Sequence, residues 1–332
     1  MKALVLKKYG GNDSLEIIDT AVPDPSPKQV LIKVHAAGLN PLDYKLRQGM
    51  LRAIKKLHFP HIMGNEVSGV VSAVGEDVSQ FKVGDRVYGR LDKDRMGGFA
   101  EFVAEDAANV ALAPNSIGLD VAAGIPLVAL TAWQCLYDVG RVKVGDKVLV
   151  HGGAGSVGRF ALQFAKQAGA EVTTTGSAAS EPLVRELGAD HFINYRSDNF
   201  EASGPVYDMV LDLVGGETLE RSFSVVKPGG KVISIAGLPE PQTAVDLGKG
   251  FLFKVLFFFV ARKQLVAARR SRAQYRYMFM RPDGETLGKF AQEIDASKLK
   301  AFLYKTFDFA SYAEAFDLQE SGKAKGKIVI KI

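Results

Sequence analysis

The feature that most constrains the fold of this chain is a set of three glycines spaced three residues apart, Gly152, Gly155 and Gly158. They follow an apolar strand and precede a helical run. The strand reads as Lys147–His151, and the helix runs from Arg159 to Ala168. The first glycine permits a tight turn, the second lets a pyrophosphate approach the backbone, and the third lets the helix pack closely on the sheet. Unpaired N–H groups at the helix N-terminus favour phosphate. We therefore predict a dinucleotide-binding site here, rather than a tight turn that binds nothing. Its residues are Gly152, Gly153, Ala154, Gly155, Ser156, Val157 and Gly158.

The end of the next strand, Glu171–Thr175, predicts which dinucleotide binds. Enzymes that prefer NAD carry an acid there to hold the ribose 2′-hydroxyl, whereas this chain continues with Gly176–Ser177. Small hydroxyl residues admit a 2′-phosphate that an acid would repel, so we expect NADPH. Arg185 and Lys327 could contact this phosphate, but each is explained equally well as an ordinary solvent-exposed charge. The expected phosphate-end residues are Gly176, Ser177, Ser180, Arg185, Tyr195 and Lys327.

Length and composition indicate a two-domain globular protein of 332 residues, with 47% hydrophobic and 24% charged side chains. The single cysteine, Cys135, excludes an internal disulfide and a cysteine-rich metal site. A net charge of +5 without interleaved aromatic and basic motifs gives little support to nucleic-acid binding. The chain starts directly in a strand, without a signal peptide pattern, so we expect a cytoplasmic location.

The pattern of short strands changes near residue 120. Before it, segments such as Gln29–Ala36 and Glu66–Val74 alternate as half-buried strands and predict a small all-β module. From Lys147 onward strands alternate with helices, which predicts a doubly wound parallel sheet of six strands ending at Tyr275–Met280. Ligands bind at the carboxyl ends of such strands, so Val214 and Gly237 should line the cofactor site.

One apolar segment, Phe251–Val260, is followed by five arginines and lysines within Arg262–Arg272. It is too short to span a membrane and contains Lys254. Three interpretations stay open, namely a helix that covers a substrate cleft, a subunit contact, and a weak contact with a membrane surface.

Five segments carry a family resemblance: the glycine turn, Ala37–Asp43, Gly64–Val71, Leu130–Ala132 and Gly322–Ile330. Together they resemble the medium-chain dehydrogenase/reductase family, on its zinc-free quinone oxidoreductase and enone reductase branch. The resemblance covers essentially the whole chain. Tyr275–Gly284 also resembles the subgroup of reticulon-interacting mitochondrial reductases and plant enone reductases.

This resemblance implies an α/β protein with a GroES-like β-barrel domain beside a Rossmann domain. The barrel would comprise residues 1–122, completed by 298–332, and the NADPH-binding Rossmann domain residues 123–297. The active site would lie in the cleft between them, Thr131 would contact the nicotinamide end, and the protein would form a homodimer.

Departures from the alcohol dehydrogenase pattern predict the chemistry. Asn40 and Asn65 stand where that pattern has a cysteine and a histidine, so we expect no metal. Without a Lewis acid, a substrate that already accepts hydride is favoured, so we expect a reductase of quinones or α,β-unsaturated carbonyls. An NADPH-binding sensor or partner-binding protein with little turnover is the alternative. Asn40, Tyr44 and Lys45 are the candidate catalytic residues; for Asn40, with Asp43 three residues on, a helix N-cap is an equally good explanation.

Overall fold

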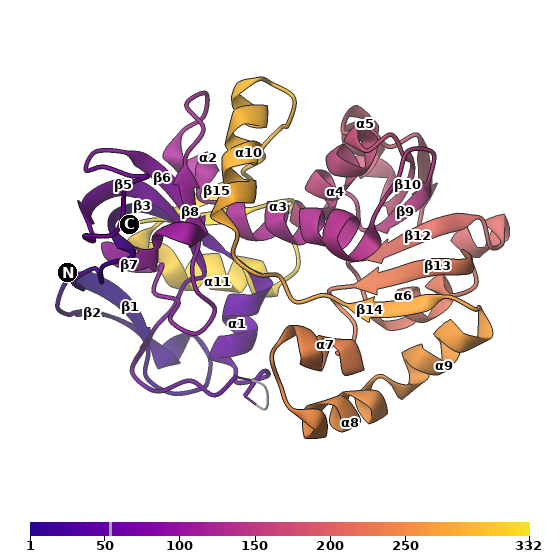
Figure 1. The fold of residues 1–332 in the computed structure, drawn as a ribbon, viewed down its shortest axis with the longest axis horizontal. Helices are drawn as coiled ribbons and strands as arrows, with labels where there is room; N and C mark the ends of the chain where they lie inside the picture. Colours follow the sequence, from indigo (N-terminus) through magenta and orange to yellow (C-terminus); the bar gives the residue numbers. More distant parts are fainter. Residues whose placement is uncertain (53–54) are drawn as a thin grey trace. The chain divides into compact units, whose positions relative to one another are not determined.

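The computed structural model describes residues 1–52 and 55–332 and divides them into two compact units (Figure 1). The first unit is Met1–Leu130 with Arg281–Ile332, and the second is Thr131–Met280. The sequence placed these boundaries after residues 122 and 297. They lie elsewhere in the structure partly because helix α10 (Gly284–Asp295) packs on strand β8 (Val110–Leu112) and so belongs to the first unit.

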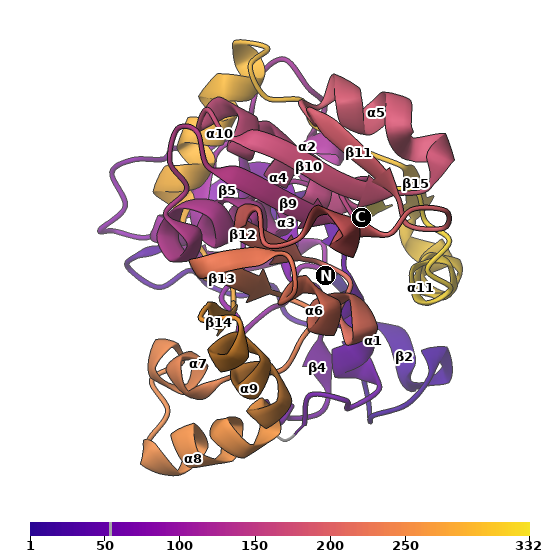
Figure 2. The ribbon, with the colours of Figure 1, turned by 90° about the vertical axis from the view of Figure 1, so that its right-hand side faces the viewer.

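The second unit is the predicted doubly wound sheet. Its six strands are all parallel, in the order β11-β10-β9-β12-β13-β14, which Figure 2 shows from top to bottom. The strands are β9 (Lys147–His151), β10 (Glu171–Gly176), β11 (His191–Asn194), β12 (Tyr207–Asp212), β13 (Val226–Ser234) and β14 (Gln274–Tyr277). The chain leaves β9 toward β10 on one side and returns to β12 on the other, so the strand order reverses beside the end of β9. Open α/β sheets bind ligands at such a point.

Helices cover both faces of this sheet. Helix α4 packs on β9 and β10, α5 on β11, α6 on β12 and β13, and α9 on β14. The helical elements of the unit are η3 (Gln134–Gly140, a π-helix), α4 (Ser156–Gln167), η4 (Ala178–Ser180), α5 (Glu181–Glu186), η5 (Phe200–Ser203), α6 (Gly216–Ser222), α7 (Pro241–Asp246), α8 (Phe251–Val260) and α9 (Arg262–Arg270). Helix α3 (Pro126–Trp133) contains the boundary after Leu130.

The first unit is built mainly on antiparallel strands around an apolar core, and β15 and β16 are its one parallel pair among the described strands. A large sheet has the order β15-β16-β3-β5-β6-β8, with β7 also paired to β3, and a small sheet has the order β2-β1-β4. The remaining strands are β1 (Lys2–Leu6), β2 (Leu15–Asp19), β3 (Gln29–Leu39), β4 (His61–Ile62), β5 (Glu66–Val74), β6 (Arg86–Arg90), β7 (Phe102–Asp106), β15 (Lys305–Asp308) and β16 (Ile328–Lys331). Short helical elements connect them: η1 (Asn12–Ser14), α1 (Pro41–Arg47), η2 (Ala107–Asn109), α2 (Leu119–Ala122), η6 (Phe309–Ser311) and α11 (Tyr312–Glu320).

Two segments differ from what their local sequence predicts. The proline and glycines of Lys227–Gly230 predict a turn before a strand, but the segment lies inside β13, where the pairing with β12 shifts register. Alternation predicts a strand at Gly98–Val103, whereas the strand of the structure starts at Phe102, as β7. By contrast β5 and β9 have the bounds that alternation and apolar content predicted.

Candidate functional site

The glycine turn joins β9 to α4 and has the geometry that the spacing predicted. Gly152 has φ +78°, a left-handed conformation that favours glycine. A Cβ on Gly158 would lie 2.4 Å from the carbonyl oxygen of Gly152, so only glycine lets the helix approach the strand. Gly155 is the N-cap of α4, and a Cβ there would lie 3.3 Å from the Gly152 carbonyl oxygen, which is a tight contact. The turn therefore leaves backbone N–H groups at the start of α4 accessible to an anion.

The end of β10 lies beside this turn and carries no acid. Ser177 follows the strand half-buried, and the Ser180 hydroxyl donates to the Ser177 carbonyl at 2.7 Å. The Tyr195 N–H donates to the Gly176 carbonyl at 3.1 Å, which fixes the start of the next loop against the same strand end. The Tyr195 side chain is 57% exposed, and the Arg196 guanidinium lies 5.5 Å from the centre of its ring.

Arg196 is a residue that the sequence reasoning missed. It lies on the exposed loop after β11 and belongs to no motif, so only the pairing of β10 with β11 brings it to this strand end. Arg185, the arginine that was expected there, donates instead to the Glu181 carboxylate at 2.8 Å and to the Asp190 carbonyl at 3.2 Å. Of these two guanidinium groups, Arg196 is the one that faces Tyr195.

A buried side-chain hydrogen bond joins the ends of β12 and β13, beside a backbone hydrogen bond from Ile235 to Asp212. The Ser234 hydroxyl donates to the Asp212 carboxylate at 2.6 Å, and both side chains are fully buried. Asp212 accepts the N–H groups of Val214 and Gly215, and Ser234 accepts that of Gly237. Val214 is 56% exposed, and a Cβ on Gly152 would touch its side chain at 3.3 Å. Val214 therefore borders the glycine turn, as the strand pattern predicted.

His151 is buried at the end of β9 and is not suited to proton transfer. Its Nδ1 lies 3.1 Å from the Thr175 hydroxyl, and its ring packs edge-on against Phe200. Burial lowers the pKa of His151 to about 4, so the imidazole is neutral at pH 7. Thr131, expected near the nicotinamide end, is buried in α3.

The first unit holds a group of polar side chains, here called the buried charge cluster, formed by Asn40, Asp43, Asn65, Glu66, Arg90 and Lys327. Each of the six side chains is at most 3% exposed. The Lys327 ammonium lies 2.6 Å from the Glu66 carboxylate, and it also donates to the Asn40 side-chain oxygen and the Leu39 carbonyl. All three ammonium hydrogens of Lys327 are thus used within this unit.

This arrangement corrects two of the site predictions. Lys327 has no hydrogen left for the 2′-phosphate of a cofactor, so we withdraw it from the phosphate residues. The Asn40 side-chain amide donates to Glu66 at 2.7 Å and to the Gly38 carbonyl at 3.3 Å, so it has none for an oxyanion. The alternative holds instead: Asn40 is the N-cap residue of α1, Pro41 follows it, and the Asp43 carboxylate accepts the Asn40 N–H at 2.8 Å.

Asp43 and Asn65 form the other half of the buried charge cluster. The Asn65 amide donates to Asp43 at 2.6 Å, and the Arg90 guanidinium donates to the Asn65 carbonyl at 3.0 Å. Burial raises the pKa of Asp43 to about 6, although these hydrogen bonds and Lys327 oppose the rise. The two asparagines that replace the zinc ligands of the alcohol dehydrogenase pattern are therefore bonded to carboxylates, and the cations beside them are the Lys327 ammonium and the Arg90 guanidinium. Within residues 1–52 and 55–332, no group of three His, Cys, Asp or Glu side chains could hold a metal ion.

Tyr44 and Lys45 lie on α1 next to this cluster in sequence, and both are half-buried. Tyr44 packs against the apolar core of the unit. Their catalytic role stays a prediction.

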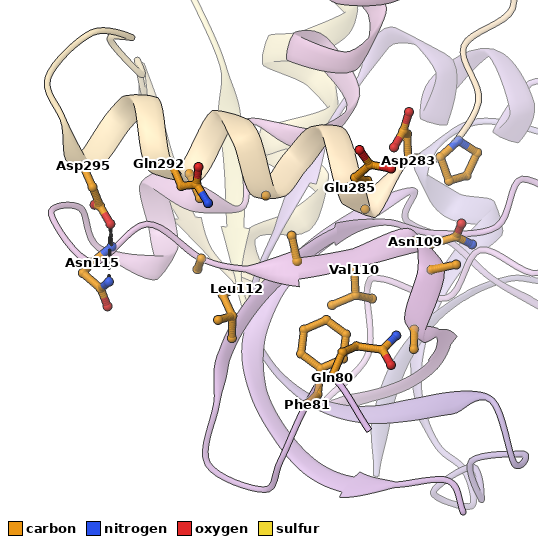
Figure 3. A pocket seen from close by; sticks show the side chains of 18 of the residues that line it. Gln80, Phe81, Asn109, Val110, Leu112, Asn115, Asp283, Glu285, Gln292 and Asp295 are labelled. Carbon is orange, nitrogen blue, oxygen red and sulfur yellow. Dashed lines mark hydrogen bonds between the residues drawn. The ribbon is translucent and has the colours of Figure 1, made fainter. Parts of the chain in front are cut away.

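A groove of about 870 Å³ lies in the first unit between β8 and α10 (Figure 3). Its polar groups serve the fold: Asp295 accepts from Asn115 and Ser116, and Asp283 accepts from the Thr286 N–H at the start of α10. The residues that line it include none of the predicted site residues. We therefore do not take it as the functional site.

Comparison with known proteins identifies the family to which this combination of units belongs. Residues 26–115 match the model of the alcohol dehydrogenase GroES-like domain, and residues 187–330 match that of the zinc-binding dehydrogenases. The mitochondrial NAD(P)H oxidoreductase RTN4IP1 of Danio rerio is 35% identical over the whole chain and 91% of its own length. The chloroplastic NADPH-dependent alkenal/one oxidoreductase of Arabidopsis thaliana is 34% identical over 99% of this chain and 79% of its own. The quinone oxidoreductase of Coxiella burnetii superposes with a TM-score of 0.84 at 32% identity, covering 100% of this chain and 99% of that one.

A GroES-like domain combined with a dinucleotide-binding sheet defines a two-domain oxidoreductase. The chain belongs to the medium-chain dehydrogenase/reductase family, and these relatives agree with its zinc-free quinone oxidoreductase branch. The family and the fold class predicted from the motifs are therefore confirmed.

Proposed function

We propose that this protein is an NADPH-dependent reductase of quinones or α,β-unsaturated carbonyls. The observation that carries the proposal is the carboxyl edge of the parallel sheet, where the glycine turn lies beside a strand end without an acid. Relatives named as NAD(P)H, alkenal/one and quinone oxidoreductases support the same cofactor and the same substrate class.

The residues of this edge fit NADPH. The missing side chain of Gly155 and the N-terminus of α4 suit a pyrophosphate. Ser177, Tyr195 and Arg196 would hold the 2′-phosphate, because a hydroxyl and a guanidinium donate to phosphate oxygens without repelling them. When bound, NADPH supplies a hydride, and the protein orients it and excludes water.

The buried charge cluster supports this substrate class. Oxidation of an alcohol needs a group that stabilises the alkoxide, and a catalytic zinc does so through thiolate and imidazole ligands. Here asparagines hold those positions and are bonded to Glu66 and Asp43. An electron-poor double bond accepts hydride without a metal, because the charge delocalises onto its own oxygen. Tyr44 and Lys45 are the proposed sources of the following proton.

Calorimetry with NADPH and NADH tests the cofactor. We expect NADPH to bind at least about tenfold more tightly, since a charge-assisted hydrogen bond contributes about 1.5–3 kcal/mol. Arg196→Ala should weaken NADPH binding by about tenfold or more and leave NADH binding unchanged, and Ser177→Glu should reverse the preference. Arg185→Ala is the matched control, because its guanidinium is held by Glu181 and Asp190. Tighter binding of NADH by the wild type would refute the cofactor proposal.

Turnover separates a reductase from a binding protein. We expect oxidation of NADPH with simple quinones and enones, unaffected by a zinc chelator. Tight NADPH binding without turnover on either class would instead favour the sensor or partner-binding function. The homodimer and the cytoplasmic location stay parts of the proposal, and light scattering during size-exclusion chromatography tests the first.

A further inference from the structure

Helix α8 exposes an unusual amount of apolar surface. Of its ten residues only Phe257 is fully buried, at 3% exposure. Leu252 is 82% exposed, Phe251 75% and Phe259 65%, and the other exposed apolar residues of the helix are Val255, Leu256, Phe258 and Val260. Single exposed apolar residues are common, but a continuous exposed apolar helix indicates a surface that another body covers.

The chain around this helix is strongly basic. Residues 247–273 contain no Asp or Glu, and they contain seven cationic residues: Lys249, Lys254, Arg262, Lys263, Arg269, Arg270 and Arg272. The whole chain has a net charge of only +5, so the remainder is net negative. Among the described residues, Lys263 is the one of the seven with an ion pair, to Glu220 at 2.5 Å. The positive charge is therefore concentrated beside the apolar helix and is mostly uncompensated.

We propose that α8 and α9 bind the protein to the surface of an anionic lipid bilayer, an activity beyond the proposed reductase. Apolar side chains would enter the boundary between headgroups and acyl chains while the cations face the acidic headgroups. No helix of the described chain is long and apolar enough to cross a membrane, and ten residues of α-helix span only about 15 Å against a hydrocarbon core of about 30 Å. The contact is thus a surface contact.

The architecture of the second unit allows this contact without unfolding. Helix α9 packs on the edge strand β14 and buries Gln264 and Ala268, whereas α8 contacts α7 and α9. Figures 1 and 2 both show α8 farther from the six-stranded sheet than α9. The apolar helix therefore extends from a basic helix that is itself fixed to the sheet.

Charge distinguishes a lipid surface from a second copy of the chain. Two copies that joined through α8 would bring two sets of seven cations together, of which only Lys263 has a described ion pair, and like charges in a contact oppose association. An anionic bilayer is complementary to both features, the apolar helix and the cations.

Vesicle flotation of the whole protein tests the proposal. We expect it to float with vesicles of phosphatidylcholine and 30% phosphatidylglycerol, to float at least about fivefold less with phosphatidylcholine alone, and to be released partly by 0.5 M salt. Equal flotation with both vesicle types, or none with either, would overturn the proposal.

Two double variants separate the contributions of apolar side chains and charge. Leu252→Ser with Phe259→Ser, and Arg269→Gln with Arg270→Gln, should each lower flotation at least about fivefold. The matched controls are Val144→Ser, 85% exposed in the same unit, and Lys82→Gln with Lys323→Gln, which should float like the wild type. Unchanged NADPH affinity and melting temperature show that the variants fold. Undiminished flotation of either double variant, or a dimer in sedimentation velocity that only Leu252→Ser with Phe259→Ser dissociates, would contradict the proposal.

Discussion

Burial changes the chemistry of His151. Its imidazole lies within the sheet beside Thr175 and Phe200, and burial holds its pKa near 4, below the value of about 6.5 in an unfolded chain. A histidine whose pKa is lowered on folding stabilises the protein fully above pH 6.5 and loses that contribution as the pH falls toward 4. The full difference amounts to about 3 kcal/mol.

We therefore predict that the second unit loses stability between pH 6.5 and 4, and that His151→Gln reduces this loss. Urea unfolding at pH 7.5, 6 and 5 measures it, followed by the fluorescence of Trp133, the only tryptophan and a residue of the same unit. The same substitution at the exposed His191 controls for the chemical change. Parallel pH slopes in wild type and His151→Gln would contradict the prediction.

Lys327 and Glu66 form an ion pair that is 3% and 0% exposed. Removing one partner leaves the other charge buried and unpaired, which costs about 3–5 kcal/mol. We predict that Lys327→Met and Glu66→Gln each destabilise the protein by this order, and that the double variant is less destabilised than the sum of the two. Denaturant unfolding of the four proteins measures the coupling. Additivity within about 0.5 kcal/mol would show that the two side chains do not act as a pair.

At the scale of elements, the turn from β9 to α4 depends on the missing side chain of Gly158. A Cβ there would lie 2.4 Å from the Gly152 oxygen and 2.6 Å from the Gly153 Cα, and neither backbone atom can move away cheaply. We predict that Gly158→Ala destabilises the protein by about 1–3 kcal/mol and weakens dinucleotide binding.

The matched control is Gly288→Ala, in the middle of α10. An added Cβ there meets no described atom within 4 Å, so the same chemical change should stabilise the protein by about 0.5–1 kcal/mol. Thermal unfolding and calorimetry with NADPH measure both effects. A Gly158→Ala protein that binds and melts like the wild type would show that the close approach is not needed.

The elements that the sequence predicted well are those whose burial follows from a local pattern. Strand β5 alternates and β9 is continuously apolar, and both have the predicted bounds. The glycine turn was likewise predictable, because backbone conformation and close packing restrict these positions to glycine. Arg196 was not predictable, because only strand pairing places it at the site. The partners of Lys327 were not predictable either, because Asn40 and Glu66 lie 287 and 261 positions away from it in the sequence. Local patterns carry no information on which distant side chain neutralises a buried charge.

At the scale of the whole molecule, the two units differ in how the chain forms them. The sheet of the second unit and its core come from one continuous stretch, Thr131–Met280. The first unit needs both ends of the chain, because β16 pairs with β3 and its Ile328, Val329 and Ile330 are fully buried. A strand such as β3, when left without its neighbour, exposes unpaired N–H and C=O groups and apolar side chains.

We therefore predict that a fragment of residues 131–280 folds alone and that a fragment of residues 1–130 does not. The first should show cooperative urea unfolding by circular dichroism and a Trp133 emission maximum like that of the intact protein. The second should aggregate or stay unfolded, and joining it to residues 281–332 through a flexible linker should restore cooperative unfolding, because α10, β15, α11 and β16 return. A folded fragment 1–130 would mean that the first unit does not depend on its C-terminal strands, and an unfolded fragment 131–280 would mean that the core of the second unit is not sufficient for its stability.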